Sequence, residues 1–540
     1  MQGADSDLCP DRLFALAELS FAFARKSQKS EYYLAAAVYA YAFLVPTDNA
    51  VALRPIDPRN RLAADLYNLG LTLGLTGADA DEVIIETGTR QLPFGSLELA
   101  VDPNQFLWGG FRMNRFVPVA QFEVRGLRNR YRQAGIGAPL AAELTPTGEG
   151  KSAELARKRI PPGIRVPVTV FVRIKDVQQG IATGAVHGQI ELYPADEATF
   201  VEVGGWKVPL ELEPTATLAY MLEGAPIWNT EIGGFLSARR LLFRDGLVML
   251  HPYQPGRIPV VLIHGTASSP ARWAEMLNEL QNDQVLRDRV QFWFFSYNTG
   301  NPILLSAKQL RESLRSALHD VDPANRDPSL HRMVLIGHSQ GGLLARLMVT
   351  DSGDRFWDSV SRVPLADLQM TPEMRDLAET TMFFTPVPFV TRVVFIATPH
   401  RGSFRAAGFT LDVIRRLVTL PLTVVRGIGD VVQQNPDALP AALRTVPTAV
   451  ENMNPRHRFI RTLSASPIAE GVTTHSIIAV LGEGPVSSST DGVVTYESAH
   501  LDGVASEMIV RSGHSTQATP DTIEEVRRIL REQVKDKLSD

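Results

Sequence analysis

From residue 257 onward, short apolar runs alternate with segments whose apolar residues recur at helical spacing. The apolar runs lie at residues 258–263, 290–295, 331–336, 392–397, 476–481 and 507–511. A strand that is apolar along its whole length is buried on both faces, and strands that alternate with helices form a parallel sheet. The pattern therefore predicts an α/β fold, with a mostly parallel sheet flanked by helices.

The residues before this pattern form a different region. With 540 residues, the chain is longer than one hydrophobic core usually organises, so we expect more than one unit. Residues 1–80 contain three apolar segments with helical periodicity, and residues 81–250 contain short β-branched runs separated by Gly and Pro. We therefore predict an N-terminal α+β extension, made of a helical segment (1–80) and a β-rich segment (81–250), ahead of an α/β domain (251–540).

The charge and the cysteine count exclude several classes of function. A net charge of −5 and a pI near 6.2 provide no basic surface for nucleic acid or for an anionic membrane. Cys9 is the only cysteine, so neither an internal disulfide nor a cysteine-based zinc site can form. Histidines and carboxylates do not gather at ligand spacing either. We expect no metal and no cofactor.

The start of the sequence leaves the location of the protein open. The longest apolar run, at residues 32–45, is too short to span a bilayer. No basic start followed by an apolar stretch and a small-residue cleavage site is visible. Two interpretations stay open: the protein is cytoplasmic, or it is exported and the sequence begins after a removed targeting segment.

A nucleophile motif follows the third apolar run. The sequence Gly-His-Ser-Gln-Gly at residues 337–341 lies between that run and an amphipathic helical segment, as a nucleophile elbow requires. The sharp turn strains the serine backbone, which explains the small residues on either side. The N-terminus of the following helix points at a forming oxyanion, and the main-chain N–H of Gln340 is the natural donor. We predict that Ser339 is a nucleophile; the alternative is a glycine-rich turn without chemistry.

Four motifs in order now carry a resemblance to a known family. They are Ile-His-Gly-Thr at 263–266, Gly-His-Ser-Gln-Gly at 337–341, Ala-Thr-Pro-His-Arg-Gly-Ser at 397–403, and Thr-Asp-Gly-Val-Val at 490–494 with Gly-His at 513–514. From about residue 257 to its end, the chain resembles the α/β-hydrolase superfamily, specifically bacterial lipase-like serine esterases. The motifs are specific for fold and nucleophile and much less specific for substrate.

The resemblance implies roles for the loop after the first strand and for a histidine. The main-chain N–H of Thr266 would be the second oxyanion donor, and His264 would be structural. In this fold the acid and the histidine follow the nucleophile. His514 comes after the last strand and just before the last helix, where the family's general base belongs. We expect the neighbouring His338 to point elsewhere and His400 to shape its loop.

The acid should follow the strand predicted at 476–481. Asp491 lies in the loop after that strand and matches the family motif residue for residue. Glu483 and Asp502 are the alternatives, and a carboxylate before glycine is often only a turn former. The motif match favours Asp491, which would hold His514 in one tautomer.

A cap is expected between the third motif and the strand at 476–481. Residues 404–470 lack a core-strand pattern, and this is where the fold inserts caps and lids. Apolar side chains there would line an acyl-binding cleft; the candidates are Phe404, Phe409, Leu417 and Leu420. Ordinary packing of a peripheral helix is the alternative. The Gly-Ile-Gly sequence at 427–429 is a candidate hinge.

Together these features favour a serine carboxylic-ester hydrolase, of carboxylesterase or lipase type, that works through an acyl-enzyme. An acyltransferase or phospholipase with the same catalytic triad stays an alternative, as does a non-catalytic binding protein that functions through its N-terminal 250 residues. The intact Ser, Asp and His set argues against the last. We expect a small-molecule or lipid ester as substrate, with possible contact to a lipid surface, no nucleic acid and no identifiable partner protein.

Overall fold

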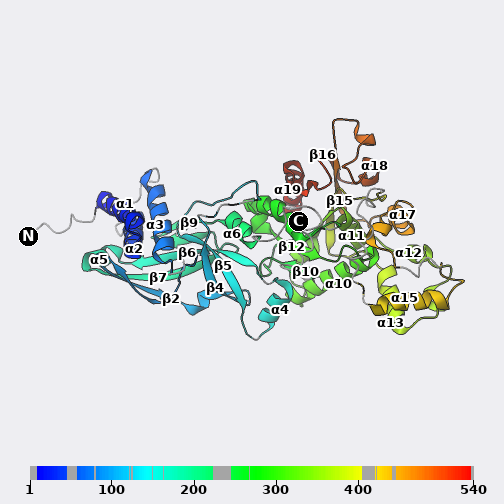
Figure 1. Cartoon of the computed structure of the whole chain (residues 1–540), viewed down its shortest axis with the longest axis horizontal. Helices are drawn as coiled ribbons and strands as arrows, with labels where there is room; N and C mark the ends of the chain where they lie inside the picture. Colours follow the sequence, from blue (N-terminus) through cyan, green and yellow to red (C-terminus); the bar gives the residue numbers. More distant parts are fainter. Residues whose placement is uncertain are drawn as a thin grey trace, which may run out of the picture. The chain divides into compact units, whose positions relative to one another are not determined.

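The computed structural model describes residues 9–45, 57–77, 81–120, 122, 124, 126–148, 150–161, 163–222, 245–266, 268–403, 420, 422–440 and 446–536. The chain divides into two compact units. The first comprises residues 1–158 and 162–223, and the second comprises residues 159–161 and 224–540. Figure 1 labels the elements of both along the chain.

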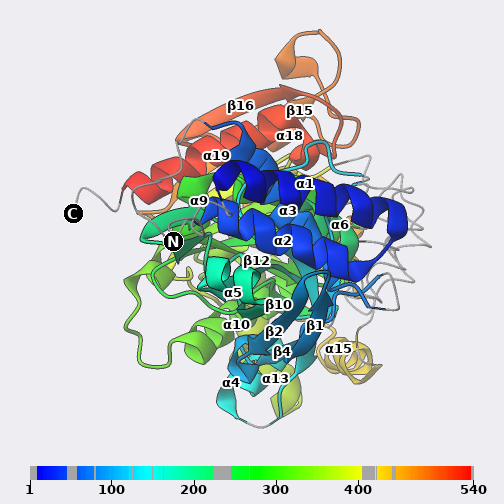
Figure 2. The same ribbon diagram turned by 90° about the vertical axis from the view of Figure 1, so that its left-hand side faces the viewer.

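Three helices begin the first unit, in the segments where the sequence predicts them. They are α1 (Pro10–Ser27), α2 (Ser30–Leu44) and α3 (Arg59–Gly74), and α2 packs against both neighbours. Figure 2 shows the three side by side in blue. Alanines and aromatic rings of α2 are buried on every side of the helix. Among the described residues, no helix is both long and apolar enough to cross a membrane.

A seven-stranded sheet forms the rest of this unit. Its strands are β1 (Gly88–Leu92), β2 (Gly95–Val101), β3 (Leu107–Trp108), β4 (Phe111–Pro118), β5 (Ala138–Pro146), β6 (Arg165–Lys175) and β7 (Ala185–Pro194). Their order is β1-β2-β7-β6-β5-β4-β3, and every pair is antiparallel except β2 with β7. Smaller elements of this region are η2 (Pro103–Phe106), α4 (Lys151–Arg159), α5 (Val177–Thr183), β8 (Phe200–Val203), β9 (Trp206–Pro209) and α6 (Pro214–Met221).

The helices and this sheet share one core, although the sequence analysis assigned them to separate segments. The buried hydroxyl of Tyr67 on α3 donates to the main-chain oxygen of Val172 on β6 at 2.7 Å and accepts from its N–H at 2.8 Å. A long-range contact of this kind does not affect the periodicity of apolar residues in a sequence. The sequence pattern therefore predicts residues 1–80 as a separate segment.

The second unit contains the predicted parallel sheet. Its strands are β10 (Gly246–Met249), β11 (Ile258–Ile263), β12 (Val290–Ser296), β13 (Met333–His338), β14 (Val390–Ile396), β15 (Thr473–Val480) and β16 (Ser506–Arg511). The order is β10-β12-β11-β13-β14-β15-β16, and only β10 is antiparallel to its neighbour. Strand β10 falls within residues 81–250, the predicted β-rich segment, but it lies at the edge of this sheet and pairs with β12.

Helices connect and cover the strands. They are η3 (Pro270–Trp273), α8 (Ala274–Gln281), α9 (Gln284–Arg289), α10 (Ile303–Val321), η4 (Pro328–Arg332), α11 (Gln340–Met348), α12 (Arg355–Asp358), η5 (Leu365–Asp367), α13 (Pro372–Met382), α15 (Leu422–Gln434), α16 (Ala449–Asn452), α17 (Arg458–Ala465), η8 (Val486–Ser488), α18 (Tyr496–Ala499), η9 (Thr516–Ala518) and α19 (Pro520–Lys535). Thr519 is the N-cap residue of α19, with Pro520 in its first turn.

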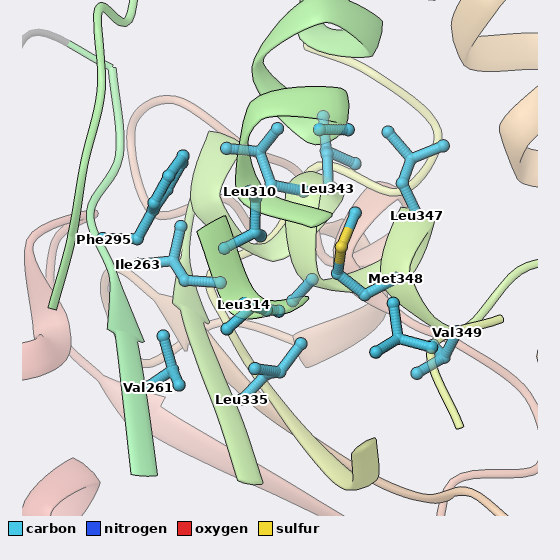
Figure 3. Close-up of a cluster of buried hydrophobic side chains, with 14 of the residues drawn as sticks. Val261, Ile263, Phe295, Leu310, Leu314, Leu335, Leu343, Leu347, Met348 and Val349 are labelled. Atoms are coloured by element: carbon cyan, nitrogen blue, oxygen red, sulfur yellow. The ribbon is translucent and has the colours of Figure 1, made fainter. Parts of the chain in front are cut away.

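The main hydrophobic core lies between this sheet and helices α10 and α11 (Figure 3). Val261 and Ile263 of β11 point into it beside Leu310 and Leu343 of the two helices. Since side chains alternate along a strand, the equally buried neighbours at positions 260 and 262 face the other side of the sheet. Burial on both sides explains the uninterrupted apolar runs in the sequence.

The helical insertion has two parts rather than one. Its described residues between β14 and β15 form α15, α16 and α17, within the cap predicted at 404–470. A second part, from α12 to α13, precedes β14, and Trp357 and Leu365 of this part share an apolar cluster with Val431 of α15. Residues 427–429, predicted as a hinge, lie inside α15, so the described backbone is helical there.

Candidate active site

Ser339 occupies a strained turn between β13 and α11. Its φ of 53° and ψ of −122° lie in a region that residues with a Cβ rarely adopt. Its N–H donates to the main-chain oxygen of Ile396 on β14 at 2.9 Å, which ties the turn to the adjacent strand. The strained turn places Ser339 between the strand and the helix, at the carboxyl edge of the sheet.

The glycines around Ser339 are required by close backbone approach. A Cβ at Gly337 would lie 2.5 Å from the main-chain oxygen of Gly341. A Cβ at Gly341 would lie 2.3 Å from the main-chain oxygen of Ile263 on β11. Both contacts are far shorter than any real Cβ makes, and both are with backbone that cannot move aside. The motif is therefore a steric requirement of the turn.

A continuous chain of hydrogen bonds links three side chains that are far apart in sequence. The Nε2 atom of His514 lies 2.8 Å from Oγ of Ser339, and its Nδ1 atom lies 2.7 Å from Oδ2 of Asp491. Because a carboxylate can only accept, Nδ1 carries the proton and Nε2 is left to accept the serine hydroxyl.

Main-chain N–H groups hold the carboxylate of Asp491 in place, independently of its bond to His514. Its Oδ1 accepts from the N–H groups of Val493 and Val494 at 2.8 and 2.7 Å, and the side chain is 3% exposed. Gly492 follows it with a φ of +96°, a conformation that favours glycine and turns the chain back over the carboxylate. One oxygen is held by the loop, so the other is free to face His514.

The strand order and the positions of three side chains along the chain together identify the fold class. Six parallel strands and one antiparallel edge strand carry a serine elbow after β13, a carboxylate after β15 and a histidine after β16. This unit has the α/β-hydrolase fold. The fold class predicted from the sequence, with its helical insertion and its N-terminal α+β extension, is confirmed.

Comparison with known proteins gives one family model and a set of solved structures that each cover about half of the chain. The family model described as PGAP1-like alpha/beta domain matches residues 254–363. Lipase BlEst2 of Bacillus licheniformis in its mature form is similar over 51% of this chain and 93% of its own, with 15% identity and a TM-score of 0.29. Lipase 1 of Pelosinus fermentans covers 52% and 98%, with 12% identity and a TM-score of 0.32. EstA of Clostridium botulinum covers 52% and 88%, with 13% identity and a TM-score of 0.32. No curated protein matches the sequence.

A small pocket of about 80 Å³ opens over Ser339. Its described lining consists of Thr266, Ser268, Arg272, His338, Ser339, Pro399, Ser403, Val450, Met453, Val493, Val494, His514, Ser515 and Gln517. The lining comes from loops at the carboxyl ends of the strands and from α16 in the insertion. Ligands bind at this edge in open parallel sheets.

A side-chain hydrogen bond joins Thr266 and Gln340, the two residues whose main-chain N–H groups are the predicted oxyanion donors. Gln340 is the first residue of α11, so its N–H has no partner within the helix. The Thr266 hydroxyl donates to the Gln340 side-chain oxygen at 2.7 Å, which holds the β11 loop against the start of α11. Gly265 allows this approach, because a Cβ there would lie 2.9 Å from Cβ of Ser339. The loop thus passes directly alongside the nucleophile.

The prediction that His338 points elsewhere is wrong. Its ring lies 5.0 Å from the ring of His514, and its Nε2 lies 2.9 Å from the main-chain oxygen of His514. His338 is the last residue of β13, so its side chain leaves the sheet at the same edge as the His514 loop. Burial, the nearby His514 and the charge of Arg272 lower the pKa of His338 to about 3. The ring is therefore neutral at pH 7 and can donate through Nε2.

The other histidines have partners away from Ser339. His264 stacks on Tyr297, whose hydroxyl donates to the main-chain oxygen of His264 at 2.8 Å. His400 is buried against Arg346 and the ring of Phe395. His475 accepts from Arg392 at 2.7 Å within the sheet. These contacts fit structural roles.

The rival carboxylates are not at the site either. Asp502 lies 3.1 Å from Nε2 of His500, on an exposed loop. Glu483 is also exposed, and among the described residues His514 makes its carboxylate hydrogen bond with Asp491.

Most of the predicted acyl-binding residues lie outside the described part of the chain. This holds for Phe404, Phe409 and Leu417. Leu420 is described and half-buried, and it is absent from the described linings of the pockets. Sequence reasoning missed Arg272 and Gln517, which do line the pocket over Ser339. Their position next to two of the quoted motifs was the available signal. In the described part of the chain, no group of three or more His, Cys, Asp or Glu side chains could hold a metal ion.

Proposed function

We propose that the chain hydrolyses carboxylic esters through an acyl-enzyme on Ser339, with His514 as general base and Asp491 as the orienting acid. The observation that carries this proposal is the hydrogen-bonded chain from Ser339 through His514 to Asp491. It combines a nucleophile, a base in the correct tautomer and a buried carboxylate in one line. The elbow geometry and the Gln340 N–H, which has no partner within α11, support the same chemistry.

In the first step, Oγ of Ser339 attacks the ester carbonyl carbon while its proton passes to Nε2 of His514. The 2.8 Å separation is within the range for such a transfer. The imidazolium that forms is stabilised by Asp491, whose carboxylate is already fixed by two N–H groups. The carbonyl oxygen becomes an oxyanion.

The N–H groups of Gln340 and Thr266 are the proposed donors to that oxyanion. The first lies at the positive end of the α11 dipole, and the second is held beside it by the bond between the two side chains. Donors that are in place before the charge develops need no reorganisation, which is why such groups lower the barrier.

The ester then breaks at its alkoxy C–O bond, and Nε2–H of His514 protonates the departing alkoxide. Water replaces the alcohol, gives its proton to His514 and attacks the acyl carbonyl. Collapse of the second tetrahedral intermediate returns the proton to Oγ and releases the carboxylic acid. Each step uses the same three side chains, and the enzyme ends as it began.

The test is turnover of p-nitrophenyl esters from acetate to decanoate, with covalent labelling by a fluorophosphonate located by mass spectrometry. We expect Ser339→Ala to abolish both, with kcat lower by about six orders of magnitude, as truncation of a triad serine does in subtilisin. Ser268→Ala is the matched control, because Ser268 lines the same pocket and should keep both. Wild-type turnover that survives Ser339→Ala, or a label on another residue, would overturn the proposal. Acyl transfer to an added alcohol in preference to water would indicate the acyltransferase alternative.

A further inference from the structure

The lining of the pocket over Ser339 divides by chemistry. The apolar side chains come from the third and fourth motifs and from the insertion; they are Pro399, Val450, Met453, Val493 and Val494. Apart from Ser403, His338, Ser339 and His514, the polar side chains come from the β11 loop and its continuation and from the residues after His514; they are Thr266, Ser268, Arg272, Ser515 and Gln517. One part of the pocket therefore suits an alkyl chain, and the other suits a polar group.

Arg272 dominates the charge of the polar part. It is the only arginine among the described lining residues, and these include no lysine and no carboxylate. Within the described residues its guanidinium makes no ion pair and no hydrogen bond, in contrast to Arg531, which pairs with Asp283. Its charge also contributes to lowering the pKa of His338. A half-buried guanidinium of this kind can bind a carboxylate or a phosphate through its N–H donors.

Gln517 lines the same part of the pocket, and the residue is 4% exposed. The NH₂ group of its carboxamide is a donor, so Gln517 can donate to an anion. The short helices that carry Arg272 and Gln517, η3 and η9, pack against each other.

We propose that Arg272 and Gln517 bind an anionic group on the alcohol part of the ester, while the apolar lining holds the acyl chain. This inference rests on the proposed ester hydrolysis and adds the substrate class: an acyl ester of an alcohol that carries a carboxylate or a phosphate. The anion is assigned to the alcohol because the apolar part of the lining is assigned to the acyl chain.

Three esters with one acyl chain separate the possibilities. They are 2-hydroxyethyl hexanoate, which is neutral, the hexanoyl ester of glycolate, which carries a carboxylate, and 2-(hexanoyloxy)ethyl phosphate. The acyl group and the first alcohol carbon are the same in all three, so differences in kcat/KM report the anion. A preference for the second or the third ester identifies carboxylate or phosphate as the natural group.

Variants of Arg272 and Gln517 test whether the charge of Arg272 causes the preference for anionic esters. Arg272→Gln should lower kcat/KM for the preferred anionic ester by about ten- to a hundred-fold and leave the neutral ester within about three-fold, as expected for loss of a charged hydrogen bond. Arg272→Lys keeps the charge and should retain part of the preference. Arg289→Gln is the control, because it removes an exposed positive charge on α9, next to the start of β12 and opposite the carboxyl edge. It should change neither rate. Gln517→Leu should weaken the anionic esters selectively, and less than Arg272→Gln.

A binding measurement keeps this test independent of catalysis. In Ser339→Ala protein, the Kd of the anionic ester by calorimetry should rise about ten-fold or more when Arg272→Gln is added. Failure of the wild type to hydrolyse any ester would overturn the proposed function, and the binding result would still decide the role of Arg272. Equal rates for neutral and anionic esters, or equal effects of Arg272→Gln on all three, would overturn the anion site.

Discussion

The neutral ring of His338 donates its Nε2–H to the main-chain oxygen of His514, across a distance of 2.9 Å. His338 ends β13 and His514 lies in the loop after β16, so this bond ties the proposed base to the strand that precedes Ser339. His338 does not contact the reacting atoms in the proposed mechanism. It acts as a positioning residue for the loop that carries His514.

Replacing His338 should therefore impair turnover without impairing binding. For a neutral ester we expect His338→Ala to lower kcat by about three- to ten-fold, the usual worth of one hydrogen bond, with KM little changed. His338→Gln offers an amide donor near the position of Nε2 and should recover part of the rate. Steady-state kinetics of both variants test this. A change in KM alone, or no recovery with glutamine, would contradict the positioning role.

Asp491→Asn tests the acid. The asparagine oxygen can still accept from Val493 and Val494, so the loop should keep its shape. Its NH₂ group would face Nδ1 of His514 and favour the wrong tautomer, and kcat should fall by about 10⁴ with binding retained. Glu483→Gln and Asp502→Asn are controls at exposed carboxylates and should be near wild type. An inactive Glu483→Gln beside an active Asp491→Asn would mean that the acid is misassigned.

The sheet and the Ser339 elbow were accessible from the sequence because both follow local rules. Burial on both faces forces the apolar runs, and backbone contacts below 3 Å force Gly337 and Gly341. The pocket lining was not accessible in this way. Arg272 and Gln517 line one pocket because η3 and η9 pack against each other. Their position next to two of the motifs is a signal of the site, but nothing in either segment marks the contact between the two short helices. The prediction for the direction of the His338 side chain was wrong for a related reason. The rule that adjacent side chains on a tight turn diverge does not take into account that the loop carrying His514 lies at the same edge of the sheet.

Three buried histidines should make the chain sensitive to acid. Burial lowers the pKa of His338 to about 3 and of His475 to about 4, and it holds the pKa of His400 well below its usual value. Below pH 6.5 the unfolded chain binds protons that the folded chain does not. The free energy of unfolding therefore falls as the pH falls from about 6.5 toward about 4, by up to about 1.4 kcal/mol per pH unit for each histidine.

Urea denaturation between pH 7.5 and 4.5 measures this slope. His475→Gln should reduce it, because the glutamine oxygen can accept from Arg392 in place of the ring nitrogen and does not titrate. The control is His500→Gln. Hydrogen bonding to Glu507 raises the pKa of His500, so this group stabilises the fold at low pH, and its removal should leave the acid-side loss in place. A flat profile between pH 7 and 5 would contradict the prediction.

The two glycines of α15 should respond differently to alanine. A Cβ at Gly429 meets nothing within 4 Å, so Gly429→Ala should stabilise the helix by about 0.5–1 kcal/mol. A Cβ at Gly427 would lie 2.5 Å from the sulfur of Met374, so Gly427→Ala must displace that side chain and should gain less. Hydrogen exchange of α15 measures both. A fall in ester turnover with Gly429→Ala would support the hypothesis that residues 427–429 act as a hinge.

The second unit contains an apolar cavity of about 280 Å³ among its described residues. This cavity is a candidate site for selection between acyl chains. Leu304 of α10, Met374 of α13 and Val431 of α15 are among its lining. Helix α16 contributes to both cavities, because Val450 lines the pocket over Ser339 and Asn452 lines this one. In the proposed mechanism, Ser339 and the oxyanion donors act only on the scissile carbonyl, so discrimination between acyl chains must come from apolar surface beyond it.

Filling this cavity should therefore penalise long acyl chains alone. Each methylene excluded from apolar surroundings costs about 0.8 kcal/mol, which is about four-fold in kcat/KM. Val431→Phe should lower kcat/KM for decanoate over acetate by about ten-fold or more, and Val431→Ala should not. Leu420→Ala is the control within the insertion, because Leu420 is absent from the cavity's described lining. An equal loss for every chain length would indicate damaged folding. An unchanged profile with Val431→Phe would place acyl selection outside this cavity, since a chain that never enters it cannot sense its volume.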